Sequence, residues 1–469
     1  MMPEIRSLRS HRGYALILEI FFLLFVLFFT GSRDTHALSI EDEKKLGREF
    51  MENIRRQYEL VDDDFAVDYI NDLGSYLVKP LETKHFPFHF YIIKSSELNA
   101  FAAPAGNIFL FTGLIETMDK IDELAAVISH EVGHVSARHL SERLEQSKTI
   151  GLATLAAILA GSLLGGAVAE AIITGSIAAG VQTQLGFSRN DERQADQLSI
   201  RYMNETGFDP AGMIRALSKI QRSGLTGTDK VPPYLLTHPG APERMANIES
   251  MLSSYTPGGP KEEAERLRRS YPMFRTVLRG RYWEPHAAEK HFHSQLEKNP
   301  LSPQAHFGLG IMRKEEAAYH EAIEHFQKAL EGLPDSLPVL RYLGEVYQLL
   351  GRDQEALKIF EKALKIDNMD RSTLFLAAMS YQNMEDYPRA NRIFERLVSM
   401  EPVQDKIFYH FGVSLGRQER YGLAHYYFGV YFKKKSNIKK ADFHFQKARE
   451  FAGSDPGLME RIRKAEEKD

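Results

Sequence analysis

The stretch ISHEVGHVSARH, residues 128–139, decides how the rest of the chain is interpreted. It places His130 and His134 four residues apart in an apolar helical pattern, so both imidazoles project from the same face of a helix. Glu131 directly follows the first histidine. This spacing is typical of zinc peptidases, in which the histidines bind the metal and the glutamate serves as general base. Because the chain contains 17 histidines, a five-residue match is not decisive and needs support from elsewhere.

That support comes from the stretch SRNDERQAD, residues 188–196. A catalytic zinc needs three protein ligands and one open position, and we expect Glu192 to be the third ligand. Asp196 lies one helical turn further on the same face, where it would accept the N–H of a ligand histidine and fix its tautomer. The chain has no cysteine, so only His, Asp and Glu side chains are available as ligands. The two stretches together predict a two-helix site with one zinc ion per chain.

The N-terminus indicates an exported protein. Arg6, Arg9 and Arg12 precede an apolar run at residues 14–29, which predicts a secretory signal peptide over residues 1–37. An uncleaved membrane anchor is the alternative, and it exports the rest of the chain equally. The length of 469 residues indicates two or more domains. A net charge of −4 gives no reason to expect a nucleic-acid partner.

The pattern up to about residue 270 predicts a mainly helical domain with a small sheet. We expect helices at residues 40–85, from Asp119 to about Glu145, at 187–207 and from about Glu243. We expect one strand at residues 88–95 and two more on either side of a turn at 104–107. Residues 149–181 are rich in Gly, Ala and Leu, with Glu170 as their only charge. They are interpreted as a buried helical hairpin or, alternatively, as a surface that contacts a membrane.

From about residue 285 the sequence repeats every 34 residues. The recurring positions are Gly310, Ala322, Phe326 and Ala329, which return as Gly344, Ala356, Phe360 and Ala363, with further copies from Ala378 and Gly412. This period, with small residues where helices cross, predicts tetratricopeptide helix pairs. Residues 422–448 also fit a second register, so the helix at about 420–434 is expected to close one repeat and open the next. The basic run at residues 433–440 is interpreted as a solvated helix end, with an anionic partner as the alternative.

Three quoted stretches carry a family resemblance. HEVGHVSARH, SRNDERQAD and THPGAPERM together resemble the zinc metallopeptidases that include HtpX and the CAAX prenyl proteases. With a signal segment in front and repeats behind, the chain is most similar to the periplasmic BepA-like branch. The resemblance implies an α+β gluzincin metallopeptidase domain at residues 38–270, followed by an all-α tetratricopeptide-repeat solenoid at 285–469. It also implies a periplasmic location, with a membrane-anchored form facing the periplasm as the alternative.

The resemblance also assigns roles to individual residues. It implies that His130, His134 and Glu192 bind zinc and that Glu131 is the catalytic glutamate. Asp196 corresponds to the family's conserved aspartate, described as a proton donor. The segment NAFAAPAGNIFLFTG, residues 99–113, matches the family's substrate-binding edge strand. Ala105 stands where the family has Gly-Gly, and this departure concerns the shape of the turn.

Three further residues are candidates for the surroundings of the zinc. His238, in THPGAPER, is either a hydrogen-bonded loop histidine or a residue near the zinc. In the second case it would donate to the developing oxyanion or occupy the fourth zinc position as a gate. Arg244 is expected to tie this loop down through a carboxylate. His139 is expected to be structural or to support a ligand, because it is rotated off the face of His134.

Three functions are compatible with the sequence. The first is an exported zinc endopeptidase that cleaves misfolded or stalled proteins in envelope and outer-membrane protein quality control. Its repeats would recruit unfolded substrates or the outer-membrane assembly machinery. The second is a chaperone or assembly scaffold that works through the repeats while its metal site is latent. The third is a structural zinc site, against which Glu131 argues, because a structural site needs four ligands and no base.

Overall fold

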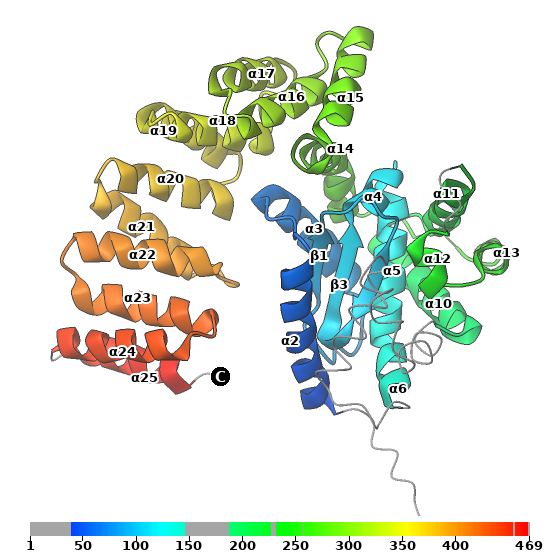
Figure 1. The fold of residues 1–469 in the computed structure, drawn as a ribbon, viewed down its shortest axis with the longest axis horizontal. Coiled ribbons are helices and arrows are strands. Elements are labelled where there is room, and N and C mark those ends of the chain that lie inside the picture. The colour runs from blue at the N-terminus through cyan, green and yellow to red at the C-terminus, as the bar shows by residue number, and fades with distance from the viewer. Residues whose placement is uncertain (1–38, 146–186, 227–230, 257, 454, 468–469) are drawn as a thin grey trace, which may run out of the picture.

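The computed structural model describes residues 39–145, 187–226, 231–256, 258–453 and 455–467 (Figure 1). The expected signal peptide at 1–37 and the apolar segment at 149–181 lie outside these residues. Among the helices within them, none is long and apolar enough to cross a membrane. The N-terminal half combines helices with one small sheet, and the C-terminal half is entirely helical in the described residues. This confirms the predicted fold class.

The sheet holds three strands in the order β1-β3-β2. They are β1 (His89–Ile93), β2 (Ala100–Ala103) and β3 (Asn107–Phe111). β1 is parallel to β3 and β2 is antiparallel to it, as expected for two strands joined by a tight turn. α2 (Ile40–Gln57) packs on the sheet through Phe50, whose ring meets the edges of Phe101 and Phe109. α3 (Asp64–Leu77) also packs against β1.

The helix that carries the histidines is shorter than predicted. α4 (Thr112–Thr117) is followed by α5 (Ile121–Ser136) and α6 (His139–Glu145), so the predicted single helix from Asp119 to Glu145 is wrong. The break falls at Arg138, which adopts a left-handed φ of 57° and cannot continue the helix. Asp119 does not cap α5, because its carboxylate accepts from Lys219 at 2.6 Å instead.

Helices on the far side of α5 complete the N-terminal domain. They are α10 (Arg189–Thr206), α11 (Gly212–Thr226), α12 (Pro233–Thr237) and α13 (Ala241–Ser253). α10 begins at Ser188, whose hydroxyl accepts from the backbone N–H of Asp191, and ends at Gly207 with a left-handed φ of 79°. Gly133 of α5 lets the two helices cross closely, because a Cβ there would lie 3.0 Å from the carbonyl oxygen of Ala195.

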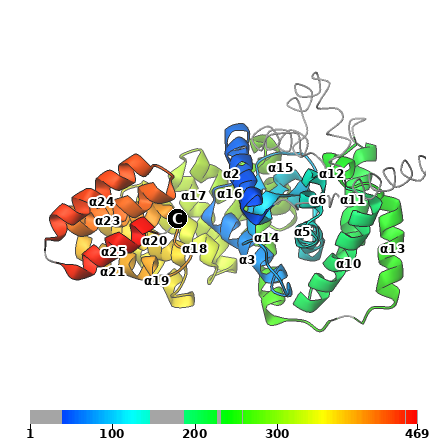
Figure 2. The same cartoon turned by 90° about the horizontal axis from the view of Figure 1, so that it is seen from below.

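α14 (Glu262–Tyr282) connects this domain to the helical pairs. The helices that follow are α15 (Pro285–Lys298), α16 (Pro303–Glu315), α17 (Tyr319–Gly332), α18 (Leu337–Leu349), α19 (Asp353–Ile366), α20 (Arg371–Asn383), α21 (Tyr387–Val398), α22 (Asp405–Arg417), α23 (Tyr421–Lys434), α24 (Ile438–Ala452) and α25 (Pro456–Glu467). They form an arch that begins at α14 and curves past α3 (Figures 1 and 2).

The recurring glycines are the places where a phenylalanine of the next helix packs onto the backbone. A Cβ at Gly310 would lie 2.5 Å from Phe326, and a Cβ at Gly344 would lie 2.3 Å from Phe360. The second register is used as well, because a Cβ at Gly429 would lie 2.5 Å from Phe445. α23 therefore packs against both α22 and α24, as expected for a helix shared by two repeats.

Candidate metal centre

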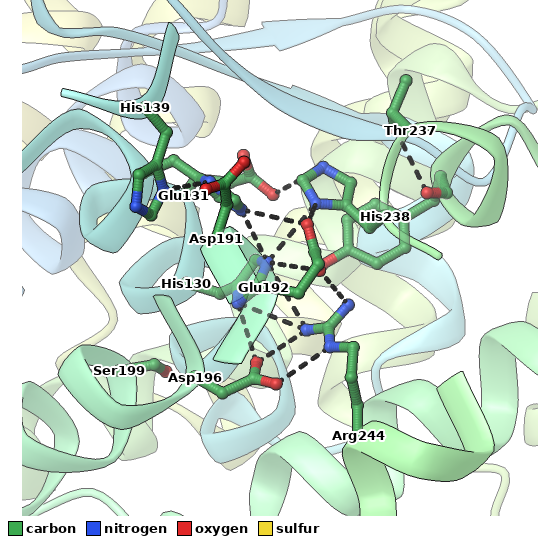
Figure 3. Close-up of polar contacts among 12 residues, drawn as sticks. His130, Glu131, His139, Asp191, Glu192, Asp196, Ser199, Thr237, His238 and Arg244 are labelled. Atoms are coloured by element: carbon green, nitrogen blue, oxygen red, sulfur yellow. Dashed lines mark hydrogen bonds and ion pairs between the residues drawn. The ribbon is translucent and has the colours of Figure 1, made fainter. Parts of the chain in front are cut away.

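The candidate centre is assembled from two crossing helices and the residue after a third (Figure 3). α5 carries His130, Glu131 and His134, α10 carries Glu192, and His238 follows α12. All five side chains are buried. One ligand atom from each of the three histidines and Glu192 lies within 4.8 Å of the others. The structure thus brings together the residues that the sequence singled out.

The outer nitrogens of the two helix histidines are occupied by neighbouring side chains. Nδ1 of His130 lies 2.9 Å from Asp196 Oδ1, and Nδ1 of His134 lies 2.9 Å from Nδ1 of His139. Nε2 of His139 in turn lies 3.0 Å from the side-chain oxygen of Gln194. The two Nε2 atoms point inward and lie 3.0 Å apart. Such partners hold each ring in the orientation that a metal ligand needs, and His139 serves as one of them.

Arg244 on α13 binds the two carboxylates that α10 contributes to the centre. Its guanidinium donates to both Asp196 oxygens at 2.9 and 2.7 Å. Nη1 lies 2.7 Å from Glu192 Oε2, close enough for an ion pair although its angle is too poor for a hydrogen bond. Because Arg244 is buried beside two carboxylates, it links α13 and the preceding His238 loop to α10. Arg244 therefore has two carboxylate partners, Glu192 and Asp196, where one was expected.

Burial and Arg244 act to lower the pKa of His130, but Asp196 and Glu192 raise it to about 9, so this imidazole carries a proton when no metal is bound. The other groups of the centre have the forms that suit a bound cation. Burial acts to raise the pKa of Glu192, but His238 and Arg244 outweigh it and hold that pKa well below the usual range. Burial is likewise outweighed at Asp196, where Arg244 and His130 lower the pKa. Burial lowers the pKa of His134 well below its usual value, so this imidazole is neutral. Ionised carboxylates and a neutral imidazole are the forms in which these side chains bind metal.

His238 lies inside the centre and not on its rim. Its Nδ1 is 3.0 Å from Glu192 Oε1 and 3.3 Å from Nε2 of His130, while its Nε2 is 3.5 Å from Glu131 Oε1. The ring of Tyr234, one helical turn earlier, stacks on it at 4.5 Å. Of the two interpretations of this residue, the placement favours the one that puts it near the metal.

Two aromatic contacts of the centre were not identified from the sequence. Phe187 stacks on His134 with 3.7 Å between ring centroids, and Tyr234 stacks on His238. Tyr234 stands four residues before His238, so the i, i+4 spacing was a signal for that contact. Phe187 directly precedes the cap of α10, and its contact depends on how α10 and α5 meet.

Several buried polar atoms of the centre lack a hydrogen-bond partner. Within the described residues, both carboxylate oxygens of Glu131 and Nε2 of His238 are buried without a hydrogen-bond partner. Leaving such atoms unpaired costs about 1–3 kcal/mol each, so they mark a place for a ligand, ion or water. Two imidazoles and a carboxylate with one adjacent free carboxylate form a donor set that fits zinc.

Family models match both halves of the chain. Residues 50–252 match the model described as Peptidase family M48, and residues 301–369 and 372–402 match models described as Tetratricopeptide repeat. The chain carries a peptidase family M48 domain. The candidate centre lies entirely within this M48 domain. The family resemblance inferred from the sequence is confirmed, and the repeats follow the M48 domain as expected.

Three curated relatives show how far the similarity extends. The Beta-barrel assembly-enhancing protease of Escherichia coli (strain K12) is 32% identical over 230 residues, which cover 48% of this chain and 47% of that protein. The Mitochondrial metalloendopeptidase OMA1 of Arabidopsis thaliana is 32% identical over 153 residues, or 33% and 29% of the two chains. The Metalloprotease LoiP of Escherichia coli (strain K12) is 28% identical over 178 residues, or 36% and 64%. The chain thus spans about half the length of the assembly-enhancing protease.

Proposed function

We propose that this protein is a zinc-dependent endopeptidase whose metal is held by His130, His134 and Glu192. The observation that carries the proposal is the convergence of these ligand atoms beside the unpartnered carboxylate of Glu131. The M48 domain and relatives named as metalloendopeptidases support the same reaction class. We propose that the peptidase domain spans residues 38–270 and that the repeat domain spans residues 285–469.

Zinc at this centre supplies a Lewis acid that polarises a carbonyl group and lowers the pKa of water. Glu131 acts as the general base, because both of its oxygens are free to accept a proton. Asp196 accepts the Nδ1–H of His130 and so presents the Nε2 lone pair inward. Arg244 keeps Glu192 and Asp196 ionised and positions them.

The edge strand β2 is proposed to align the substrate. In the described sheet β2 is an edge strand that pairs only with β3, so its other edge has no strand partner there, although the strand itself is buried. A polypeptide in extended conformation would pair with that edge by main-chain hydrogen bonds, which select for unfolded segments and not for a particular side chain. Such a substrate preference agrees with the cleavage of misfolded or stalled proteins.

His238 is proposed either to gate the fourth metal position or to stabilise the oxyanion. Its Nδ1 already lies among the ligand atoms, which supports the gate. Donation to the developing oxyanion would instead require the imidazole to swing toward the substrate carbonyl. The gate keeps the resting centre closed to water, whereas the oxyanion donor is needed for turnover.

The biological setting is proposed from the relatives and the N-terminal sequence. Proteins named for β-barrel assembly support a role in outer-membrane protein quality control. We propose a periplasmic location with a signal peptide, unfolded envelope proteins as substrates and assembly machinery as partner of the repeats. A contact of residues 149–181 with membrane belongs to the same proposal. The separate surface of the repeat arch favours a second function as a chaperone or scaffold.

The test of the peptidase is the substitution Glu131→Gln, which keeps the size of the side chain but removes the base. We expect casein cleavage to fall by about 10²–10⁴-fold, the usual contribution of a general base, while bound zinc measured by mass spectrometry stays near one ion per chain. Glu249→Gln on the exposed side of α13 is the matched control. Undiminished cleavage by Glu131→Gln, or cleavage that survives chelation, would contradict the mechanism.

A further inference from the structure

The inner side of the repeat arch holds a piece of the peptidase domain. The segment DDDF, residues 62–65, enters α3 and faces α18, α20 and α22. Three of these four residues make side-chain contacts with the repeats, although more than 270 residues separate them in the chain. α3 lies within the curve of the arch (Figure 1).

The contacts pair acidic and aromatic groups of the segment with donors of the repeats. The hydroxyl of Tyr342 donates to the Asp63 carboxylate. Nζ of Lys406 donates to both oxygens of Asp64, at 2.9 and 2.7 Å. The guanidinium of Arg341 lies 5.5 Å from the ring centre of Phe65, a cation–π contact. Consecutive carboxylates followed by an aromatic ring are thus contacted by side chains of two helices, α18 and α22.

The recognising side chains occupy equivalent positions of successive repeats. Arg341, Phe375 and Tyr409 are spaced by 34 residues, as are Ser372 and Lys406. They therefore recur on the same face of α18, α20 and α22. Arg341, Ser372 and Lys406 line a groove of about 220 Å³ together with the segment. Exposure rises along the row of equivalent positions from 6% for Arg341 to 9% for Phe375 and 40% for Tyr409.

The apolar core joins the segment to α18, because Phe65 packs against a buried cluster that includes Tyr342, but this core does not extend to α20 and α22. α20, α21, α22 and α23 share a core of their own. In the described part of the chain, α20 and α22 contact α3 through polar pairs, namely Ser372 with Asp68 at 3.4 Å and Lys406 with Asp64. A cleft of about 920 Å³ lies between α3, α14 and the repeats. Polar contacts of this kind allow one part to move against the other.

Carboxylates also crowd this contact. Asp68 is exposed to water within the cleft, yet the cleft walls partly desolvate it. This desolvation, together with the charges of Asp64, Asp370 and Asp72, raises the pKa of Asp68 to about 6 in spite of Arg341. Asp68, three residues beyond the segment, therefore lies among like charges at the contact between α3 and the repeats.

We propose that the groove of Arg341, Ser372 and Lys406 is a recognition site for a polypeptide segment with consecutive carboxylates followed by an aromatic residue. Residues 62–65 are its intramolecular occupant. A partner segment of the same chemistry binds by displacing them and frees α20–α25 from α3. A tethered segment has an effective concentration in the mM range, so a partner must overcome that competition. The inference concerns the repeats and holds whether or not the peptidase is active.

The test uses a fluorescent synthetic peptide with the sequence of residues 61–72 and measures its binding to the full chain by anisotropy. We expect weak binding to the wild type. In the variant Asp63→Asn/Asp64→Asn/Phe65→Ala, whose own segment is released, we expect binding at least about tenfold tighter, because the internal competitor is lost. A peptide in which the first three aspartates, Asp62 to Asp64, are asparagine and Phe65 is alanine should not bind.

Two substitutions in the released variant locate the site. Lys406→Gln should weaken peptide binding at least about tenfold, since it removes a charge-assisted contact. Lys439→Gln, at an exposed lysine outside the groove, should leave binding unchanged. Equal binding by the wild type and the released variant, or binding indifferent to Lys406→Gln, would overturn the proposal. If the released variant misfolds, hydrogen exchange of the wild-type chain provides the test. The amides of Ala66 and Val67 donate hydrogen bonds to Asp63, so excess peptide should make both exchange faster. Unchanged exchange would overturn the proposal.

Discussion

At the scale of single residues, the two proposed roles of His238 make opposite predictions for turnover. Its imidazole lies 3.0 Å from Glu192 and 3.3 Å from His130, within the set of ligand atoms. A histidine held there competes with substrate and water for the same position, so its loss should favour turnover. Donation to an oxyanion would have the opposite consequence, because turnover would lose its stabilising contact.

We expect His238→Ala to raise casein cleavage by about tenfold, which corresponds to removing a ground-state contact worth about 1.4 kcal/mol. The measurement is the initial cleavage rate at equal zinc occupancy, with Glu131→Gln/His238→Ala as the inactive background. His286→Ala, an exposed histidine outside the centre, is the control. A fall in rate at unchanged zinc content would assign His238 to the oxyanion.

The spacing of residues predicted the two-helix centre because helical geometry alone relates i to i+4. His130 with His134, and Glu192 with Asp196, needed no knowledge of the fold. Two left-handed backbone positions could not be predicted from this spacing. Arg138 and Ala105 adopt left-handed φ values of 57° and 64°, which favour glycine or asparagine, so neither side chain signalled the turn.

At the scale of elements, the repeats were predictable because packing repeats with the sequence. Phe360 packs on the backbone at Gly344 within one 34-residue unit, so the same glycine and phenylalanine positions recur in other copies. Comparing equivalent positions of the repeats also shows where their residue types differ. Equivalent positions hold apolar pairs in the inner repeats, such as Leu340 with Ile359. The first pair and the last hold two histidines instead, His306 with His325 and His425 with His444.

These histidine pairs join helices through their imidazoles. Nδ1 of His425 lies 2.9 Å from Nδ1 of His444, which links α23 to α24. Burial, His425 and Lys440 lower the pKa of His444 from 6.5 to about 4. The folded hairpin therefore prefers the neutral imidazole, and unfolding takes up a proton below pH 6.5. The stability from this pair is complete above pH 6.5 and is lost as the pH falls through 4.

We expect amide exchange in α24 to become about threefold faster, after correction for intrinsic rates, between pH 7 and pH 5. One pKa unit equals about 1.36 kcal/mol, and the partial exposure of His444 screens much of the shift. His425→Leu/His444→Ile restores the apolar pair of the inner repeats and should remove this acceleration. The charged groups that face the pair, Lys440, Lys447 and Glu450, stay in place in the variant. Equal acceleration in the variant would show that another group causes it.

At the scale of the whole molecule, the sequence did not indicate that the arch closes on α3. The contact between Asp63 and Tyr342 spans 279 residues and has no periodic pattern, unlike the helix and repeat contacts. It depends on the direction in which α14 leads the chain out of the M48 domain. Acidic residues at the start of a helix are common on solvent-exposed faces, so the segment at 62–64 gave no sign of a partner.

Asp68 makes this closed arrangement sensitive to pH, with α3 seated in the groove. Desolvation and the nearby carboxylates raise its pKa from 3.8 to about 6, and the part of this shift that the repeats cause favours the protonated carboxyl when the cleft closes. Closure is therefore most favourable below pH 3.8 and weakens as the pH rises through 6. Because Asp68 remains exposed to water in the cleft, we expect the effect to stay below about 1 kcal/mol.

Asp68→Asn mimics the protonated form at every pH and should strengthen closure above pH 6. Because the chain has no cysteine, Glu52→Cys on α2 and Asp442→Cys on α24 provide two specific sites for fluorescent labels. We expect energy transfer between the labels to fall from pH 5 to pH 8 in the wild type and to stay constant in Asp68→Asn. Glu361→Gln, exposed on α19, should behave like the wild type. If Asp68→Asn retained the full pH response, the carboxyl that controls closure would have to be another one in the cleft, with Asp370 next to Arg341 the first to substitute.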